Sequence, residues 1–161
     1  MRVLFVCLGN ICRSPTAEAA VAEALAERGV AERVHLDSAG IGNWHLGNPP
    51  DARMRAAAAD HGLHVDGSAR QVRTSELETW DLIVAMDRQN LAELRAMAPS
   101  EHVAGRMRLF RDFDPDADHA EVPDPYYGGA SGFADVVRIC RSAARGLADE
   151  IVTRVDADRS P

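Results

Sequence analysis

The feature that most constrains the fold is a short apolar run near the N-terminus that stops abruptly. Residues 2–7, RVLFVC, are apolar and partly β-branched, which predicts a buried strand. The polar, glycine-containing segment LGNICRSP follows at once, over residues 8–15. We expect Ser14 to cap a helix that starts at Pro15 and ends at Gly29. A buried strand that turns directly into a helix is typical of the first unit of a parallel α/β sheet.

The same alternation of strand and helix continues along the chain. Short apolar runs predict strands, and apolar residues at helical spacing predict helices. The expected strands are 33–40, 81–86 and 106–110, and the expected helices are 51–62, 87–97 and 133–155. This order favours one parallel sheet with helices on both faces, in a single domain over residues 1–161. The long segment 112–132 is a candidate functional loop.

Charge and hydropathy exclude several classes of protein. The net charge of −7 argues against binding to nucleic acid or to an anionic membrane surface. The N-terminal apolar run ends at Gly9 and Asn10, short of the roughly 7–15 residues of a signal-peptide core. No later stretch is long and apolar enough to cross a bilayer. Three cysteines are too few for a disulfide scaffold, so we expect a cytoplasmic protein in a reducing compartment.

Residues 7–15 have the composition of an anion-binding loop. Ligands of parallel sheets bind beyond the carboxyl ends of the strands, where this segment lies. A turn into a helix N-terminus points several N–H groups at one place, and the helix dipole adds positive potential. Gly9 and Asn10 tolerate the dihedrals of such a turn, and Arg13 can grip two phosphate oxygens. Because the loop lacks the lysine of a nucleotide-binding P-loop, nucleotide binding is poorly supported.

Cys7 stands at the base of this loop. Positive potential favours the ionised thiol, which is then placed for in-line attack on a bound phosphoryl group. Arg13 and the loop amides would stabilise the charge that develops on the phosphoryl oxygens, and the Ser14 hydroxyl could donate to the thiolate. An isolated cysteine at a strand end would favour a structural role. A cysteine followed by five residues and then by Arg-Ser-Pro favours a catalytic one.

The segment VCLGNICRSPTAEA, residues 6–19, resembles the signature of the low-molecular-weight protein tyrosine phosphatases. Similar motifs follow along nearly the whole chain: SAG at 38–40, GNWH at 42–45, ARQV at 69–72, MDRQN at 86–90 and DPYYGG at 124–129. The resemblance implies a flavodoxin-like, four-stranded parallel sheet. It also implies hydrolysis of phosphotyrosine in proteins through a cysteinyl-phosphate intermediate, without metal or cofactor. The phosphate-binding loop would comprise Leu8, Gly9, Asn10, Ile11, Cys12 and Ser14, between Cys7 and Arg13 as catalytic residues.

The resemblance also assigns an acid and the walls of a pocket. Asp124 would donate a proton to the leaving phenolate and then act as a base toward water. From the residues alone, an ordinary Asp-Pro turn is an equal alternative for Asp124. Trp44, Tyr126 and Tyr127 would form aromatic walls, deep enough for phosphotyrosine and too deep for phosphoserine.

The acidic residues before this motif do not fit a calcium loop. A loop of the EF-hand type beginning at Asp112 would need glycine and glutamate where Ala117 and Pro123 stand. The six histidines show no metal-ligand spacing. We therefore expect no metal and a solvated acidic loop.

Supporting residues follow from the resemblance as well. Ser38 would share a hydrogen-bond network with Asn10 and Ser14, and Asp87 and Asn90 would support the loop from a neighbouring helix. The family commonly has a histidine three residues before Arg70, where this chain has Gly67. The expected hydrogen-bond network therefore lacks a member at this position. Cys12 would be a redox partner that captures oxidised Cys7 as a disulfide, while Cys140 lies on an apolar helix stripe and is expected in the core.

Three alternatives remain open at this point. Arsenate reductases share the loop but use two further cysteines in the second half of the chain, where only Cys140 is present. Protein-arginine phosphatases carry threonine where Ile11 stands and lack the aromatic pair. A non-catalytic phosphate-binding module would need neither the thiol nor the acid. Tyrosine-phosphorylated proteins are therefore the expected partners of a monomeric enzyme, and the sequence names neither the individual substrates nor the cognate kinase.

Overall fold

The computed structural model describes residues 1–158. The four strands are β1 (Arg2–Cys7), β2 (His35–Gly40), β3 (Leu82–Ala85) and β4 (Met107–Leu109). The α-helices are α1 (Arg13–Glu27), α2 (Ala52–Asp60), α3 (Arg88–Met97), α4 (Glu101–Ala104) and α5 (Ala130–Ala157). Three short 3-10 helices are η1 (Ala31–Arg33), η2 (Thr74–Thr79) and η3 (Phe110–Phe113).

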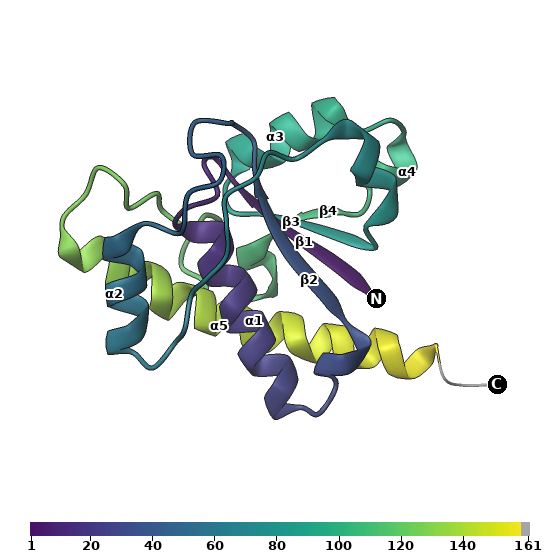
Figure 1. Cartoon of the computed structure of the whole chain (residues 1–161). Helices are drawn as coiled ribbons and strands as arrows, with labels where there is room; N and C mark the ends of the chain where they lie inside the picture. Colours follow the sequence, from purple (N-terminus) through teal and green to yellow (C-terminus); the bar gives the residue numbers. More distant parts are fainter. Residues whose placement is uncertain (159–161) are drawn as a thin grey trace.

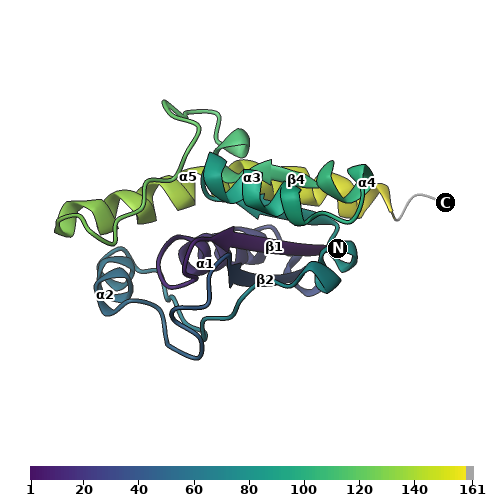
Figure 2. The same cartoon turned by 90° about the horizontal axis from the view of Figure 1, so that it is seen from above.

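The strands form one parallel sheet in the order β2-β1-β3-β4. The order places β1 in the interior, paired with β2 on one side and β3 on the other. Figure 1 shows α1 and α5 on one face of the sheet and α3 on the other, and Figure 2 shows the same layers from above. The predicted fold, a flavodoxin-like parallel sheet covered on both faces, is confirmed.

Alternate residues of β1 belong to two separate cores. Val3 and Phe5 pack in the larger core, which α1, α2 and α5 cover. Leu4 and Val6 pack in the smaller core, with residues of α3 and α4. Because all four side chains are fully buried, the strand shows an unbroken apolar run rather than an alternating one. This burial fixes the end of β1, and with it the start of the loop that follows.

The structure corrects some of the predicted boundaries. Helix α1 begins at Arg13 with Cys12 at the N-cap, so the prediction that Ser14 caps the helix is wrong. The Ser14 hydroxyl lies in the buried interior of the loop, where it contacts Cys7 and Asn10 instead of a free helix N–H. By contrast, the helix predicted over 87–97 is close to α3. Asp87 stands at its N-cap, where its side chain accepts from the N–H of Asn90.

Helix α5 starts three residues before the predicted Phe133, because its first turn, Ala-Ser-Gly, carries no large apolar side chain that would mark it in the sequence. The short helices η1, η2, η3 and α4 were not predicted. In residues 1–158, no helix combines the length and the apolarity that a membrane span requires.

Candidate active site

The loop between β1 and α1 folds around the end of the sheet. The carbonyls of Cys7 and Leu8 accept from the segment after β2, at 2.9 Å each, and the Ile11 carbonyl accepts from Asp51 N–H at 2.8 Å. A Cβ atom on Gly40 would lie 3.0 Å from the Leu8 carbonyl oxygen, tighter than an ordinary contact, so glycine favours this close approach. Backbone hydrogen bonds from the segment after β2 and from the start of α2 therefore hold the loop in place.

Asn10 is the centre of the hydrogen bonds inside the loop. Its backbone lies at φ 58°, in the left-handed region that asparagine tolerates. Its amide group donates to Ser14 Oγ at 2.9 Å and to Ser38 Oγ at 3.0 Å, and its Oδ1 accepts from Arg70 N–H at 3.0 Å. The network links the loop to β2 and to the segment before η2.

Cys7 has two polar neighbours in this network. Its sulfur lies 3.0 Å from Ser14 Oγ and 3.3 Å from the backbone nitrogen of Asn10, which donates to it. Because the Asn10 amide already donates to Ser14 Oγ, the Ser14 hydroxyl proton is free to point at the sulfur. Two donors therefore converge on the thiol, an arrangement that stabilises negative charge on sulfur.

Arg13 is almost fully buried, with 3% of its surface exposed. Its Nη1 donates to Asp87 Oδ2 at 2.6 Å and to the Val122 carbonyl at 3.1 Å, and its Nη2 donates to Asp124 Oδ2 at 3.4 Å. Burial alone would lower the pKa of Arg13, but the neighbouring Cys7, Asp87 and Asp124 outweigh it and raise the pKa. The guanidinium is thus charged and fixed in direction.

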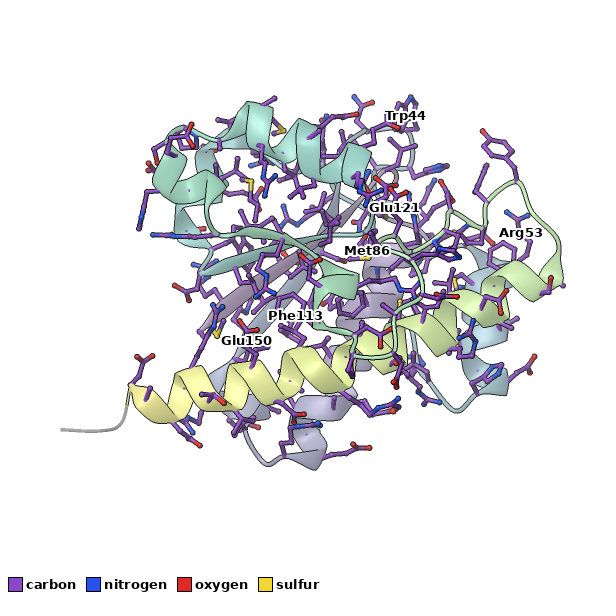
Figure 3. The ribbon with its side chains drawn as sticks, turned by 180° about the vertical axis from the view of Figure 1, so that it is seen from behind. Trp44, Arg53, Met86, Phe113, Glu121 and Glu150 are labelled. Carbon is purple, nitrogen blue, oxygen red and sulfur yellow. The ribbon has the colours of Figure 1, made fainter. Side chains whose placement is uncertain are left out.

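These residues surround one cavity of about 370 Å³. Its lining comprises Cys7, Leu8, Gly9, Ile11, Cys12, Arg13, Trp44, His45, Asp124, Tyr126 and Tyr127. The three aromatic residues of the expected walls are all present, although Trp44 is 66% exposed and Tyr127 is 94% exposed. Figure 3 shows Trp44 at the edge of the molecule, pointing outward. In this structure these two residues therefore form the rim of the cavity rather than its depth.

The sequence analysis missed two residues near the aromatic wall. His45 lies so close to the loop that a side chain on Gly9 would approach its Cδ2 to 3.0 Å, and its ring is 6.0 Å from that of Tyr126. Arg53 lies with its guanidinium 5.4 Å from the centre of the Tyr126 ring. His45 belongs to the GNWH motif, which was a signal for its position, whereas nothing in the sequence marked Arg53.

The supporting residues lie next to the loop. One carboxylate oxygen of Asp87 accepts from the Arg13 guanidinium. The other accepts from the N–H of Asn90 at 2.7 Å. Asn90 thus acts through its backbone, and its own Oδ1 has no partner in the part of the chain that is described. Where the resemblance leads one to expect a histidine, Gly67 has φ 116°. The N–H of Arg70, three residues later, is the group that reaches Asn10.

The three cysteines are free thiols, and all are buried. Burial, together with the negative charge of Asp51 and Cys7, raises the pKa of Cys12 to about 12. Cys140 is fully buried in the larger core, as expected, and burial raises its pKa as well. Across residues 1–158 there is no group of three histidine, cysteine or acidic side chains that could hold a metal ion.

Comparisons with known proteins all point to one family. The family model for low molecular weight phosphotyrosine protein phosphatase matches residues 2–159. A low molecular weight protein-tyrosine-phosphatase of Streptomyces coelicolor is 43% identical over 157 residues, 96% of each chain. The Bacillus subtilis phosphatase YfkJ is 44% identical over 146 residues, 90% of this chain and 92% of the relative.

A solved structure supports the same relationship. The protein tyrosine phosphatase of Entamoeba histolytica, crystallised with Hepes in its active site, superimposes with a TM-score of 0.92 at 39% identity. The match covers 96% of this chain and 98% of that one. By sequence along nearly its whole length and by structure, the chain belongs to the low-molecular-weight protein tyrosine phosphatase family.

Proposed function

We propose that this phosphatase acts through a cysteinyl-phosphate intermediate on Cys7, with Asp124 as general acid and base. One observation carries the proposal: Cys7, Arg13 and Asp124 line the same cavity, and Arg13 contacts Asp124 at 3.4 Å. A thiol, a cation and a carboxyl group around one space are what phosphoryl transfer to sulfur requires.

In the first step the Cys7 sulfur attacks phosphorus, an S–P bond forms and the bond from phosphorus to the phenolic oxygen breaks. Arg13 and the N–H groups of the loop hold the equatorial phosphoryl oxygens. The protonated carboxyl group of Asp124 gives its proton to the departing phenolate, which leaves as tyrosine. Because a pocket that already holds a fixed cation needs little reorganisation, the charge is stabilised as it develops.

In the second step a water molecule attacks the phosphorus of the intermediate. Asp124, now ionised, takes a proton from that water, and the S–P bond breaks to release inorganic phosphate. The electron pair returns to the Cys7 sulfur, where the Ser14 hydroxyl and the Asn10 N–H stabilise it. Asp124 thus donates a proton in the first step and accepts one in the second, and the S–P bond formed in the first step breaks in the second.

We propose tyrosine-phosphorylated proteins as the substrates, on a single-domain, monomeric enzyme. The aromatic residues around the cavity suit the ring of phosphotyrosine, since aromatic rings stack favourably. Ile11 lies in the cavity lining, at the position where protein-arginine phosphatases carry threonine, and the pair Tyr126 and Tyr127 is present. These residues favour phosphotyrosine over phosphoarginine. Oxidation of Cys7 to a sulfenic acid by peroxide would allow Cys12 to form a disulfide with loss of water.

The test is hydrolysis of matched phosphotyrosine and phosphoserine peptides in the presence of a metal chelator. We expect the parent to release phosphate from the phosphotyrosine peptide only. Cys7→Ser should be inactive, and Asp124→Ala should lose roughly 100-fold or more on esters with poor leaving groups. Cys140→Ala is the matched control, because that fully buried thiol is not among the residues that line the cavity. Full turnover by Cys7→Ser would rule out the covalent route.

A further inference from the structure

The segment that carries Asp124 has no regular structure between η3 and α5, yet it is fixed by a buried cation. Arg111, in η3, is only 5% exposed. Its Nη1 donates to the Glu121 carbonyl at 3.2 Å, and its Nη2 donates to Asp118 Oδ1 at 2.9 Å. One guanidinium therefore binds two positions in the first half of this segment at the same time.

The near end of the loop is tied to the same cation. Asp114, which is also buried, has Oδ2 at 3.8 Å from Arg111 Nη2. Its other oxygen accepts from Ser142 Oγ in α5 at 2.8 Å and from Asp116 N–H at 3.0 Å. The cation is thus linked to α5 through Asp114, and it holds three positions in the first half of the segment (114, 118 and 121) together.

The path from Arg111 to the proposed acid is short. Glu121, whose carbonyl Arg111 holds, accepts through its carboxylate from Arg88 N–H at 2.8 Å. The next residue, Val122, donates its N–H to the Met86 carbonyl at 2.8 Å, and its own carbonyl accepts from Arg13. Figure 3 labels Glu121 and Met86, which lie near each other at the end of the sheet.

Only Pro123, with its fixed φ, separates this anchored pair from Asp124. The Asp124 carboxyl group also accepts from the Tyr126 N–H at 3.1 Å, which fixes it within its own turn. The position of that turn at the cavity depends on how firmly residues 121–122 are held. The contact from Arg13 to Asp124, at 3.4 Å, is long for a charged pair and does not fix the carboxyl group alone.

We propose that Arg111 is a positioning residue for the acid step: by binding Glu121, Asp118 and Asp114 it fixes the loop so that Asp124 faces the leaving oxygen. The inference rests on the proposed role of Asp124 and adds to it a specific source of its orientation. A displacement of about 1 Å in a proton donor can cost roughly 100-fold in rate. Arg13 touches the same pair through the Val122 carbonyl but is also held by Asp87 at 2.6 Å. The arrangement of Arg111 therefore bears more on proton donation than on attack by sulfur.

The test uses a partner of the cation that the fold can lose without harm. The side chain of Asp118 is 74% exposed, and its hydrogen bond to Arg111 lowers its pKa. Asp118→Asn weakens one contact of Arg111 at the surface. Arg111→Gln removes the cation that makes all of these contacts. Asp116→Asn is the matched control, since it makes the same change of charge in the same loop at an exposed residue whose N–H, not its side chain, bonds to Asp114.

Each variant is made in the parent and in the Asp124→Ala background, and kcat/KM is measured on two substrates. Phenyl phosphate has a leaving group with a pKa of about 10, like tyrosine, and needs the proton. Para-nitrophenyl phosphate has a far better leaving group and needs it less. In the parent we expect Asp118→Asn to lower kcat/KM for phenyl phosphate roughly 3- to 10-fold and for para-nitrophenyl phosphate less than about 2-fold. Arg111→Gln should show the same selectivity with a larger loss.

In the Asp124→Ala background, neither variant should change kcat/KM further. Equal losses on both substrates, losses that persist in that background, or no loss beyond that of Asp116→Asn would each overturn the proposal. If Arg111→Gln fails to fold, as judged by thermal unfolding, the losses of kcat/KM in Asp118→Asn decide the test by themselves. Failure of the proposed function is a separate result, because Asp124→Ala itself would then leave the dependence on the leaving group unchanged.

Discussion

Cys7 and Cys12 share one loop but differ in their surroundings. Cys7 receives hydrogen bonds that stabilise a thiolate, whereas burial and nearby negative charge raise the pKa of Cys12 to about 12. The fold therefore favours the neutral form of Cys12. The stabilisation from that form is complete below the ordinary pKa of a thiol and is lost as the pH rises toward 12.

We predict that iodoacetamide at about pH 8 modifies Cys7 and leaves Cys12 intact. At that pH roughly one Cys12 in ten thousand is ionised, and only the thiolate reacts. Mass spectrometry of the digested protein reports both sites, and inorganic phosphate should protect Cys7 by filling the loop. Unfolding in urea is the control, because Cys12 should then react readily. Equal labelling of the two cysteines in the native protein would contradict the prediction.

Single residues also show what sequence reasoning can and cannot reach. The left-handed backbone of Asn10 was predictable, because only a few residue types tolerate it. Ser14 was misread as a cap because Ser-Pro before a helical stretch is a common starting signal. Its hydroxyl instead contacts Cys7, and no local pattern distinguishes those two uses of the same side chain.

At the scale of elements, the start of α2 supports one wall of the cavity. Asp51 caps α2 by accepting from Arg53 N–H, and its own N–H donates to the Ile11 carbonyl of the phosphate loop. Its carboxylate also binds the Arg53 guanidinium at 2.8 Å, which lies over the rings of Tyr126 and Phe133. The helix start thus connects the loop, the aromatic wall and α5.

We predict that Arg53→Met raises KM for aryl phosphates roughly 2- to 5-fold and leaves kcat within about 2-fold of the parent. Loss of the cation over the Tyr126 ring frees that ring to move, which weakens substrate stacking but touches no reacting atom. Steady-state kinetics on phenyl phosphate measure the split. Arg55→Met is the matched control on the same helix, since Arg55 binds the Pro50 carbonyl instead. A fall in kcat with KM unchanged would contradict this role for Arg53.

The elements themselves were largely predictable, and their ends were not. The apolar runs that became β1 and β3 are buried on both sides, so each is a clear signal in the sequence. The one-turn helix α4 has few residues and only one buried side chain, Val103, so it leaves no periodic pattern. Contacts such as Arg53 over Tyr126 join elements that are far apart in sequence and carry no local signal.

At the scale of the whole molecule, the sheet order brings distant segments to one cavity. Arg13 and Asp124 are 111 positions apart and still form an ion pair. The segment before Asp124 bonds to Met86, just after β3, and β3 lies beside β1, whose end leads to Arg13. The motifs of one sequence are enough to predict which residues form the site. The distances between those residues arise from the packing of the sheet and α5. Arg111 was overlooked for the same reason, since its partners become neighbours only when the loop folds back.

Because the buried Arg13 guanidinium is in place before any ligand binds, phosphate binding should stabilise the whole fold. Arg13 is fixed by Asp87 and Asp124, so a bound phosphate meets a charge that is already oriented. A ligand that binds only the folded state stabilises it by about 2.7 kcal/mol at a hundred times its dissociation constant. For a chain of this size that shift corresponds to a rise in Tm of roughly 5–10 °C.

We predict such a rise with inorganic phosphate for the parent and for Cys7→Ser, measured by calorimetry against sodium chloride at equal ionic strength. Cys7→Ser keeps the donors of the loop and the guanidinium, so it loses the nucleophile without losing the anion site. Arg13→Met should lose most of the rise, because the loop N–H groups alone lack the fixed charge that balances phosphate. Its own Tm without phosphate must be compared first, since Asp87 would be left without its partner. An equal rise in Arg13→Met would mean that phosphate acts elsewhere on the surface, and the guanidinium could not then be the group that holds the substrate.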